Sequence, residues 1–467
     1  MIDKSKLPPS WEVVKLGDVC EIFQGYGFPI IMQRKSKGKF PFYKVGDISR
    51  NVLSGNQYLE YCENYIDDEE LQKLKAKPYP KKTIVFAKIG EALKLNRRAL
   101  TKYPCIVDNN AVGLKAVEII CSDLFLFFFL KLIKLEKYSR ATTVPSVRKS
   151  EIKAIEIPLP PLPEQHRIVA KIEELFSELD KGIESLKTAR QQLKIYRQAV
   201  LKWAFEGKLT HENVKDGELP EGWKWVKLGE VCEDIEIVKR KEKNGETEFL
   251  YLDIGGIDNL TNKIVNHKQY KWKEAPSRAQ QIIFKDDVLF STVRTYLKNI
   301  AIVEKNIYNG AIASSGFTVI RGNKEITNPK FLFYLSLSHL FLQPLNELQT
   351  GSSYPAVRDK DVFSQSIPLP SLLEQHQIVQ EIETRLSVCD KLEETITTAL
   401  QKSEALRQSI LKKAFEGRLV EQNPNDEPAS KLLERIRAEK AAEQRHIYRK
   451  RNKPTTNKAP EERNVNE

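Results

Sequence analysis

The chain has 467 residues, enough for two or three domains, and its apolar content of 41% is ordinary for a protein that buries cores. It has no apolar run long enough to span a bilayer, no signal-peptide pattern at its start and no C-x-x-C pair among its six cysteines. We therefore expect a cytoplasmic protein without a zinc site or disulfide framework, whose net charge of +12 suits a polyanionic partner, although many soluble basic proteins bind no nucleic acid.

The first predicted elements are strands. They are short runs of β-branched and aromatic residues bounded by glycine, asparagine, aspartate or proline, at Val13–Leu16, Thr83–Lys88 and Val112–Val117. Leu124–Leu135 is a more continuous apolar run and predicts a helix. The mixture predicts an α/β block with an irregular strand order.

A long helix follows this block, between Ile157 and Leu209. Its apolar residues recur three or four positions apart, which indicates the a/d seam of a coiled coil. Pro163 suits a first helical turn and Gly207 suits a left-handed C-cap, so we expect a helix of roughly 44 residues, about 65 Å long. The candidate seam residues are Ile168, Ile172, Leu175, Leu179, Ile183, Leu186 and Leu193.

A second block repeats the first. Trp11–Cys20 returns as Trp223–Cys232, 212 residues later, and each copy follows a Leu-Pro pair. Near the block ends, Thr142–Arg148 matches Ser352–Arg358 at a shift of 210 residues. A repeat of this length indicates duplicated domains. The predicted elements here are strands at Val288–Val293 and Phe317–Ile320 and a helix at Pro329–Leu342.

The long helix also returns. Glu374–His376 repeats Glu164–His166 and Ala414–Leu419 repeats Ala204–Leu209, both at a shift of 210 residues, so neither copy has gained or lost a residue. A single apolar seam of this length needs a partner in water. Either the two helices pack on each other, which we favour, or each packs along its own globular neighbour. The candidate seam residues of the second copy are Ile378, Ile382, Leu392, Ile396, Leu406 and Ile410.

Beyond Gly417, Ala429–Arg445 predicts a short charged helix, and we expect disorder after it. The predicted fold class is mixed α/β, with two globular domains, two long helices and a pseudo-twofold internal repeat. The segments are a first domain at 1–157, a helical spacer at 158–210, a second domain at 211–367, a second spacer at 368–420, and a charged helix and tail at 421–467.

Enzymatic signatures are scarce. The sequence has no Walker A motif, no G-x-G-x-x-G and no H-E-x-x-H. Glu151-Ile152-Lys153 resembles the Glu-x-Lys of nucleases, but its repeat partner is Asp361-Val362-Phe363, which argues against catalysis. The duplicated Glu-Gln-His at each helix start is better explained as a structural polar contact than as a catalytic group.

Basic residues are numerous in loop-like stretches of both blocks, beside asparagine, serine, threonine and tyrosine. That mixture supplies phosphate clamps and groups that read base edges. For any single lysine, a solvated surface charge is the more ordinary interpretation. Arg148 and Arg358 are stronger candidates because a duplicated loop fixes their place, and Arg294 follows them. The candidate DNA contacts are Lys88, Arg97, Arg98, Thr142, Arg148, Arg240, Arg294, Lys298, Ser353, Tyr354 and Arg358.

From Leu7 to about Lys440, the sequence resembles the specificity (S, HsdS-type) subunit of type I restriction-modification systems. Paired Ile-Pro-Leu-Pro and Glu-Gln-His helix starts, paired Ala-Phe-Glu-Gly-(Lys/Arg)-Leu helix ends and the paired tryptophan-led block starts carry the likeness. Val288–Arg294 and Glu427–Ile436 add to it. One departure is that Thr210–Glu218 lacks a helix like the one after the second long helix.

The resemblance implies two target-recognition domains joined by two long helices that form an antiparallel coiled coil. Each domain would bind one half of a bipartite asymmetric site in double-stranded DNA. The helices would set the spacing and dock two methyltransferase (M) subunits, and restriction (R) subunits would join the assembly. The seam residues are therefore candidates for helix pairing or partner binding.

The resemblance also implies a non-catalytic chain that binds no metal or cofactor, with S-adenosylmethionine, ATP and Mg²⁺ in its partner subunits. One alternative is a free-standing DNA-binding or scaffold protein without methyltransferase partners. A neighbouring reading frame with an Asn-Pro-Pro-(Tyr/Phe) methyltransferase motif would separate the two. An enzyme in its own right is disfavoured by the missing motifs.

Overall fold

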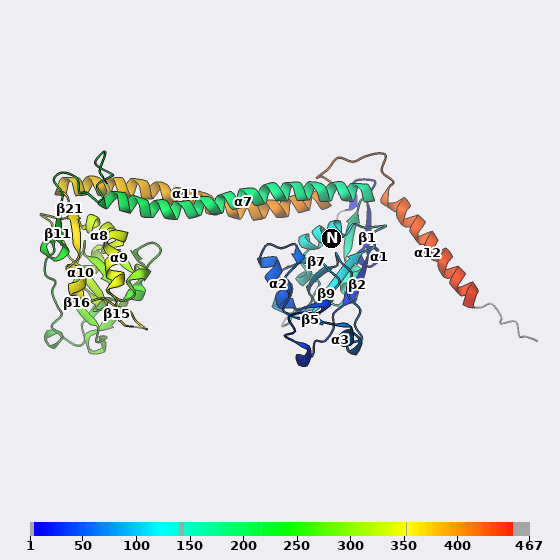
Figure 1. Ribbon diagram of the computed structural model, residues 1–467, viewed down its shortest axis with the longest axis horizontal. Coiled ribbons are helices and arrows are strands. Elements are labelled where there is room, and N and C mark those ends of the chain that lie inside the picture. Colours follow the sequence, from blue (N-terminus) through cyan, green and yellow to red (C-terminus); the bar gives the residue numbers. More distant parts are fainter. Residues whose placement is uncertain (1–3, 140–143, 216, 352, 452–467) are drawn as a thin grey trace, which may run out of the picture. The chain divides into compact units, whose positions relative to one another are not determined.

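The computed structural model describes residues 4–139, 144–215, 217–351 and 353–451. The chain divides into two compact units, the first formed by residues 1–183 and 401–467 and the second by residues 184–400. The division cuts through both long helices, α7 (Leu162–Phe205) and α11 (Leu372–Phe415), so that each unit contains part of each helix. Figure 1 shows both helices and the strands and helices around them. Within the described residues, no helix has the length and apolarity to cross a membrane.

The first unit is mixed α/β, as predicted. A five-stranded sheet has the order β2-β9-β6-β7-β4, a three-stranded sheet has the order β5-β3-β8, and β1 pairs with β10. Its strands are β1 (Glu12–Lys15), β2 (Cys20–Gln24), β3 (Phe40–Tyr43), β4 (Tyr58–Leu59), β5 (Tyr65–Ile66), β6 (Ile84–Ala87), β7 (Ala99–Thr101), β8 (Ile106–Val107), β9 (Ala111–Ala116) and β10 (Glu156–Leu159). Its shorter helices are α1 (Leu16–Val19), α2 (Val45–Leu53), α3 (Asp68–Lys73), α4 (Glu91–Lys94), α5 (Asp123–Leu132) and α6 (Lys149–Ala154).

The core of the first unit draws on three distant parts of the chain. The predicted helix after the sheet is α5, whose residues from Phe125 to Leu130 are all buried. The rings of Phe125 and Phe129 lie 5.0 Å and 5.4 Å from the ring of Phe415, near the end of α11. Leu433 of α12 (Ala429–Arg451) is buried in the same cluster. The predicted charged helix is therefore present, and its first turns belong to the core; the tail beyond Arg451 lies outside the described residues.

The second unit repeats this plan with a different sheet arrangement. A four-stranded sheet has the order β15-β12-β19-β16, a three-stranded sheet has the order β18-β17-β20, β13 pairs with β14, and β11 pairs with β21. Its strands are β11 (Lys224–Lys227), β12 (Glu248–Leu252), β13 (Ile257–Asp258), β14 (Lys263–Ile264), β15 (Lys268–Lys271), β16 (Ala279–Ile283), β17 (Val288–Ser291), β18 (Ile300–Ile302), β19 (Ala311–Ser314), β20 (Phe317–Ile320) and β21 (Ser366–Leu369). Its shorter helices are α8 (Pro329–Leu337), α9 (His339–Glu347) and α10 (Asp359–Phe363).

The helix predicted over Pro329–Leu342 is two helices. Ser338 ends α8 in an extended conformation, and its side chain accepts a hydrogen bond from the backbone of Phe341, which caps α9. Serine favours such a cap over a helix interior because its hydroxyl replaces a missing backbone acceptor. Both units pack a helix on the end of a long helix through phenylalanine rings. In the second unit the ring of Phe331 of α8 lies 5.3 Å from that of Phe205 of α7, as α5 packs on Phe415 of α11 in the first unit.

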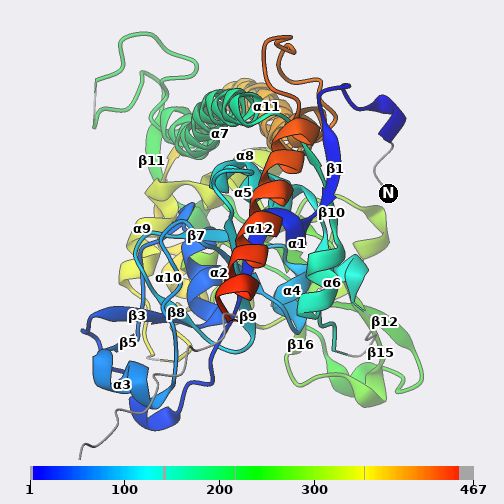
Figure 2. The ribbon, with the colours of Figure 1, turned by 90° about the vertical axis from the view of Figure 1, so that its right-hand side faces the viewer.

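In each unit α7 and α11 run side by side in opposite directions, and Figure 2 views them along their axes. In the first unit Arg407 pairs with Asp180, and in the second unit Arg197 pairs with Asp390 at 2.6 Å. Arg407 and Asp390 each lie 210 residues after their counterparts, Arg197 and Asp180, so this is one ion pair made twice. Both packing schemes left open by the sequence therefore occur: the helices pair with each other, and their ends pack on the globular parts.

The predicted seam residues of α7 and α11 are buried or half-buried, except Leu392 and Leu406, which were wrong as seam residues. Both are about half exposed, at 47% and 49%. Between the buried Cys389 and Ile396, the seam passes through Glu393, which pairs with Arg197 at 3.1 Å. Arg407 similarly takes the place assigned to Leu406. A charged residue can hold a seam position here because its partner on the facing helix compensates the charge.

Candidate nucleic-acid interface

Each long helix begins at a carboxylate that joins separate chain segments. Oε1 of Glu164 accepts hydrogen bonds from Nε1 of Trp11 at 3.0 Å and Nε2 of Gln422 at 2.7 Å. Oε1 of Glu374 likewise accepts one from Nε1 of Trp223 at 3.0 Å. The duplicated Glu-Gln-His is thus a structural contact, as expected, and it fixes each globular part on its helix.

The duplicated loops before α7 and α11 lie beside the ends of β6 and β17, which the sequence did not predict. In the first unit, residues 88–90 and 145–148 are hydrogen-bonded to each other, and we call these two segments the first loop pair. The backbone N–H of Gly90 donates to the backbone oxygen of Pro145 at 2.8 Å, and that of Val147 donates to the backbone oxygen of Lys88 at 2.9 Å. In the second unit, residues 292–294 and 355–358 form the second loop pair through equivalent backbone bonds. The N–H of Arg294 donates to the oxygen of Pro355 at 2.8 Å, and that of Val357 donates to the oxygen of Thr292 at 3.0 Å. Both loop pairs therefore have the same backbone frame.

The first loop pair carries Lys88 and Arg148. Nζ of Lys88 donates to Oε1 of Gln24 at 3.0 Å, and partial burial lowers the pKa of Lys88. Arg148 is exposed at the start of α6, where its backbone N–H donates to the Glu151 carboxylate at 2.7 Å. Thr142, predicted for the same loop, lies outside the described residues. The two described cations thus lie on the two paired segments of the first loop pair.

The second loop pair carries Arg294 and Arg358, and Ser353 and Tyr354 directly precede its second segment. The Arg294 guanidinium lies 4.9 Å from the centre of the Tyr354 ring, and its Nη2 donates to the backbone oxygen of Ser353 at 3.1 Å. The exposed Arg358 is held at the start of α10 by Asp361, through Nε and Nη2 bonds of 3.0 Å each, and this carboxylate raises the pKa of Arg358. Both guanidinium groups of the second loop pair therefore have fixed contacts, and that of Arg294 lies against an exposed tyrosine.

Arg98 is wrong as a DNA contact. Its side chain is only 2% exposed, its guanidinium lies 4.5 Å from the centre of the Phe86 ring, and its Nη2 donates to Oδ1 of Asn96 at 2.7 Å. Burial lowers the pKa of Arg98 to about 9. The neighbouring Arg97 is half-buried, and its backbone oxygen accepts a bond from Arg98. Pattern alone does not distinguish a surface arginine from one packed on a core aromatic ring.

Two other predicted cations are attached elsewhere in the second unit. Lys298 has a left-handed backbone (φ 55), and its Nζ reaches Oε1 of Gln198 on α7 at 3.4 Å; burial lowers its pKa. Arg240 is exposed but bonds to the backbone oxygens of Ala275 and Pro276 and of Ala279, the first residue of β16. Sequence reasoning also missed Asn346, whose Oδ1 accepts from the Thr295 hydroxyl at 2.5 Å and steadies the second loop pair from α9.

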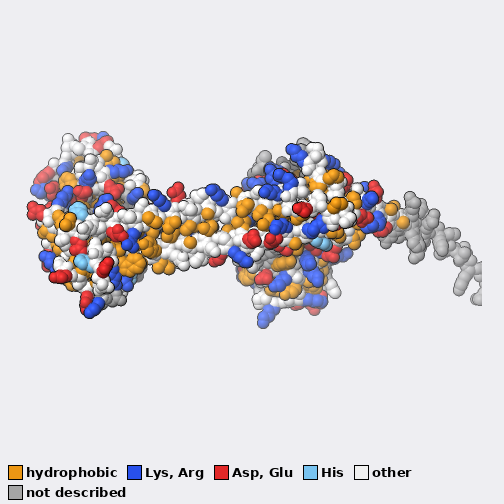
Figure 3. Space-filling view, turned by 90° about the horizontal axis from the view of Figure 1, so that it is seen from above, with side chains coloured by type: hydrophobic (Ala, Val, Ile, Leu, Met, Phe, Trp, Pro, Cys, Tyr) orange, Lys and Arg blue, Asp and Glu red, His pale blue; other side chains and the backbone are white. Residues whose placement is uncertain are grey.

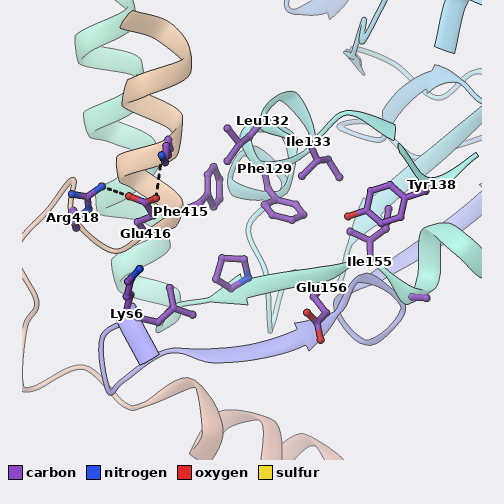
Figure 4. Close-up of a pocket in the computed structure, with 14 residues that line it drawn as sticks. Lys6, Phe129, Leu132, Ile133, Tyr138, Ile155, Glu156, Phe415, Glu416 and Arg418 are labelled. Carbon is purple, nitrogen blue, oxygen red and sulfur yellow. Dashed lines mark hydrogen bonds and ion pairs between the residues drawn. The ribbon is translucent and has the colours of Figure 1, made fainter. Parts of the chain in front are cut away.

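A groove of about 1090 Å³ lies in the first unit, where α5 and β10 meet the end of α11 (Figure 4). Phe129, Ile155 and Phe415 form part of its apolar wall, whereas Lys412, Glu416 and Arg418 form a linked set of charges at one side. Both signs of charge beside an apolar wall suit a protein side chain better than a nucleic acid. Within the described residues, no cluster of histidine, cysteine, aspartate or glutamate could hold a metal ion.

The long helices also carry exposed apolar side chains (Figure 3). Ile195 of α7 and Val388 and Leu392 of α11 are 63%, 53% and 47% exposed within the second unit. In the first unit, Leu406 of α11 is 49% exposed. Leu392 and Leu406 do not lie in the seam, but because they are exposed they remain candidates for contact with a partner subunit.

Comparison with known proteins agrees with this arrangement. The family model for the type I restriction modification DNA specificity domain matches twice, over residues 8–190 and 220–402. The chain is 27% identical over 464 residues to the type I restriction enzyme EcoBI specificity subunit of Escherichia coli, covering 93% of each chain. It is 27% identical over 350 residues to the EcoDI specificity subunit of the same species, covering 68% of this chain and 77% of that one. The crystal structure of the HsdS subunit from Thermoanaerobacter tengcongensis matches the fold with a TM-score of 0.58 at 24% identity, over 88% of this chain and 98% of that one.

Proposed function

Because the chain belongs to the DNA specificity family of type I restriction-modification systems, we propose that its two units each read one half of a bipartite, asymmetric site in double-stranded DNA. The observation that carries this proposal is the pair of loop frames, identical in backbone bonding but different in side chains. A shared frame lets both units approach DNA in the same way, while different side chains select different bases.

Chemistry on DNA is assigned to partner subunits. S-adenosylmethionine, ATP and Mg²⁺ would be bound by methyltransferase and restriction subunits. The chain itself would be a non-catalytic component that binds DNA in the cytoplasm. Two methyltransferase subunits would dock through the exposed apolar residues of the long helices and through the groove beside Phe415, which are surfaces of protein-like chemistry.

The first expected result concerns salt. The chain alone should bind duplex DNA weakly and lose affinity steeply as salt rises, because cations that neutralise phosphates release counterions. Tight, sequence-specific binding should appear only with a methyltransferase subunit. Gel shifts or titration calorimetry at two salt concentrations, with and without that subunit, would measure both effects. Affinity that does not change with salt would contradict phosphate contacts.

The second expected result concerns the exposed arginines of the loop pairs. Arg148→Ala and Arg358→Ala should each weaken DNA binding by roughly 5- to 150-fold, the range for a lost base-edge contact, with little change in melting temperature because both side chains are exposed. Lys324→Ala is a suitable control, since this lysine is 70% exposed and pairs with Asp286, which precedes β17, whereas the second loop pair follows that strand. A variant that no longer folds would show that the arginine is structural.

A further inference from the structure

The two loop pairs differ most at one backbone position. Gly90 and Arg294 make the same backbone bond to a proline of the opposing loop, and both have a positive φ. Gly90 has φ 75 and ψ −169, a region nearly restricted to glycine, whereas Arg294 is left-handed helical, with φ 50 and ψ 56. Glycine adopts a positive φ freely, whereas a residue with a Cβ atom does so at a cost. The first unit therefore has the unstrained residue at this position, and the second unit places a long cationic side chain there despite the strain.

The Arg294 side chain is fixed from several directions. Tyr354 lies against its guanidinium, Ser353 accepts one hydrogen of Nη2, and its Nε is buried without a hydrogen-bond partner among the described residues. The position corresponding to Tyr354 in the first unit is Val144, which has no ring to offer. This support is therefore specific to the second loop pair.

The loop beneath Arg294 is also rigid. The backbone N–H and the hydroxyl of Thr292 both donate to the backbone oxygen of Gly316 at 3.0 Å, and Thr295 is bonded to Asn346. A guanidinium held by stacking and a single bond loses little entropy when its remaining donors bind a ligand. Those donors form a planar fork, which matches the O6 and N7 acceptors of guanine in the major groove.

On the basis of the proposed function, we infer that Arg294 is a specificity-determining residue that reads the O6/N7 edge of one guanine in the half-site of the second unit. Tyr354 acts as a positioning residue that holds the guanidinium plane. A mobile cation is sufficient to neutralise a phosphate, whereas bidentate recognition of one base edge depends on the orientation of the guanidinium plane, which Tyr354 restricts here. The first unit, with Gly90 and Val144, reads its half-site by other side chains.

Three substitutions test this inference, two at Arg294 and one at Tyr354. Arg294→Gly introduces the residue that the first unit has at the equivalent position, so the left-handed backbone is kept without strain. Arg294→Lys keeps the charge and removes the planar fork. Tyr354→Val copies the first unit's Val144, and Lys324→Ala is the surface control. Each full-length variant would be assayed with its methyltransferase subunit on duplexes in which every base pair of the site is changed one at a time.

Both Arg294 variants should lose roughly 5- to 150-fold of discrimination at a single G·C pair, in the half-site assigned to the second unit, and Tyr354→Val should lose part of it. Discrimination at the other base pairs of the site should equal that of the wild-type complex. An equal loss at every sequence would make Arg294 a phosphate contact, and unchanged discrimination would make it structural; either result overturns the inference while leaving the proposed function intact. A wild-type complex without any sequence preference would overturn the proposed function itself, and the inference with it.

Discussion

Exchanging residues 1–157 for the same segment of another specificity subunit should replace one half of the recognised DNA site and leave the other half unchanged. The reason is that the first loop pair, with Lys88 and Arg148, lies wholly within the exchanged segment. The second loop pair, with Arg294 and Arg358, lies in the other unit and has its own supporting contacts. The reciprocal exchange of residues 211–367 should change only the other half.

The structure restricts which donor can be used for this exchange. Phe125 and Phe129 pack on Phe415, and Trp11 donates to Glu164; Phe415 and Glu164 stay with the recipient chain. A donor with small residues in place of these aromatics would leave a cavity, and loss of a buried phenylalanine costs about 3–5 kcal/mol. A donor with aromatic residues at all three positions should give a folded chimera. Methylation mapping would give the result, and a change in both half-sites would indicate a single shared reading surface.

Removing four residues from each long helix, Ser185–Thr188 from α7 and Thr395–Thr398 from α11, should shorten the preferred gap between the half-sites by one or two base pairs. Four residues correspond to about 6 Å of helix and about 40° of net rotation. DNA rises about 3.4 Å per base pair along each strand, so the shorter helices fit a shorter gap. Both half-sites should stay the same, because neither loop pair is altered.

The repeated ion pairs explain why the deletion must be matched. On each helix the deleted residues lie between the aspartate and the arginine: Asp180 and Arg197 on α7, and Asp390 and Arg407 on α11. Deleting from both helices lets the two ion pairs form in one new register. If only α7 is shortened, each of the two ion pairs can form only in its own register of α7 on α11, and these two registers differ by four residues. One ion pair is then lost, so this single deletion should lower the melting temperature. Methylation of substrates that differ only in gap length is the assay; a matched variant that still prefers the original gap would show that the helices do not set it.

Much of the fold could be predicted because its main signals are local or repeated. The long helices were predicted at roughly 44 residues from seam spacing, and α7 and α11 each have 44. Gly207 and Gly417 are left-handed at the helix ends, with φ of 76 and 71. A Cβ atom at Gly207 would lie 2.1 Å from Cγ of Pro220, so tertiary packing also requires glycine here.

What sequence reasoning missed depends on contacts between distant residues. Leu392 and Leu406 satisfy apolar spacing as well as their neighbours do, but Arg197 and Asp180 on the facing helix select Glu393 and Arg407 for the seam. In sequence, Arg98 does not differ from the other cations in loops. Its burial follows from its packing on the ring of Phe86, which only the structure shows. In both cases the partner lies far along the chain or across a sheet, where periodicity carries no information.

The candidate site was only partly predictable for the same reason. The duplicated loops with Arg148 and Arg358 were visible in sequence, but the short helices α6 and α10 that begin after these two residues were not predicted. Their pairing with residues 88–90 and 292–294 required the fold. The equivalence of Gly90 and Arg294 could have been read by extending the match between Thr83–Ala87 and Asp287–Ser291 by three residues. Only the structure shows that both positions have a positive φ.

The central claim, that two units read two separate half-sites, is tested most directly by sequencing modified bases in the genome of cells that express this chain with its methyltransferase subunit. We predict methylation within one bipartite, asymmetric motif, made of two defined halves separated by a fixed number of unspecified base pairs, and no such methylation when the chain is omitted. A single uninterrupted motif, or methylation that does not depend on the chain, would contradict the account.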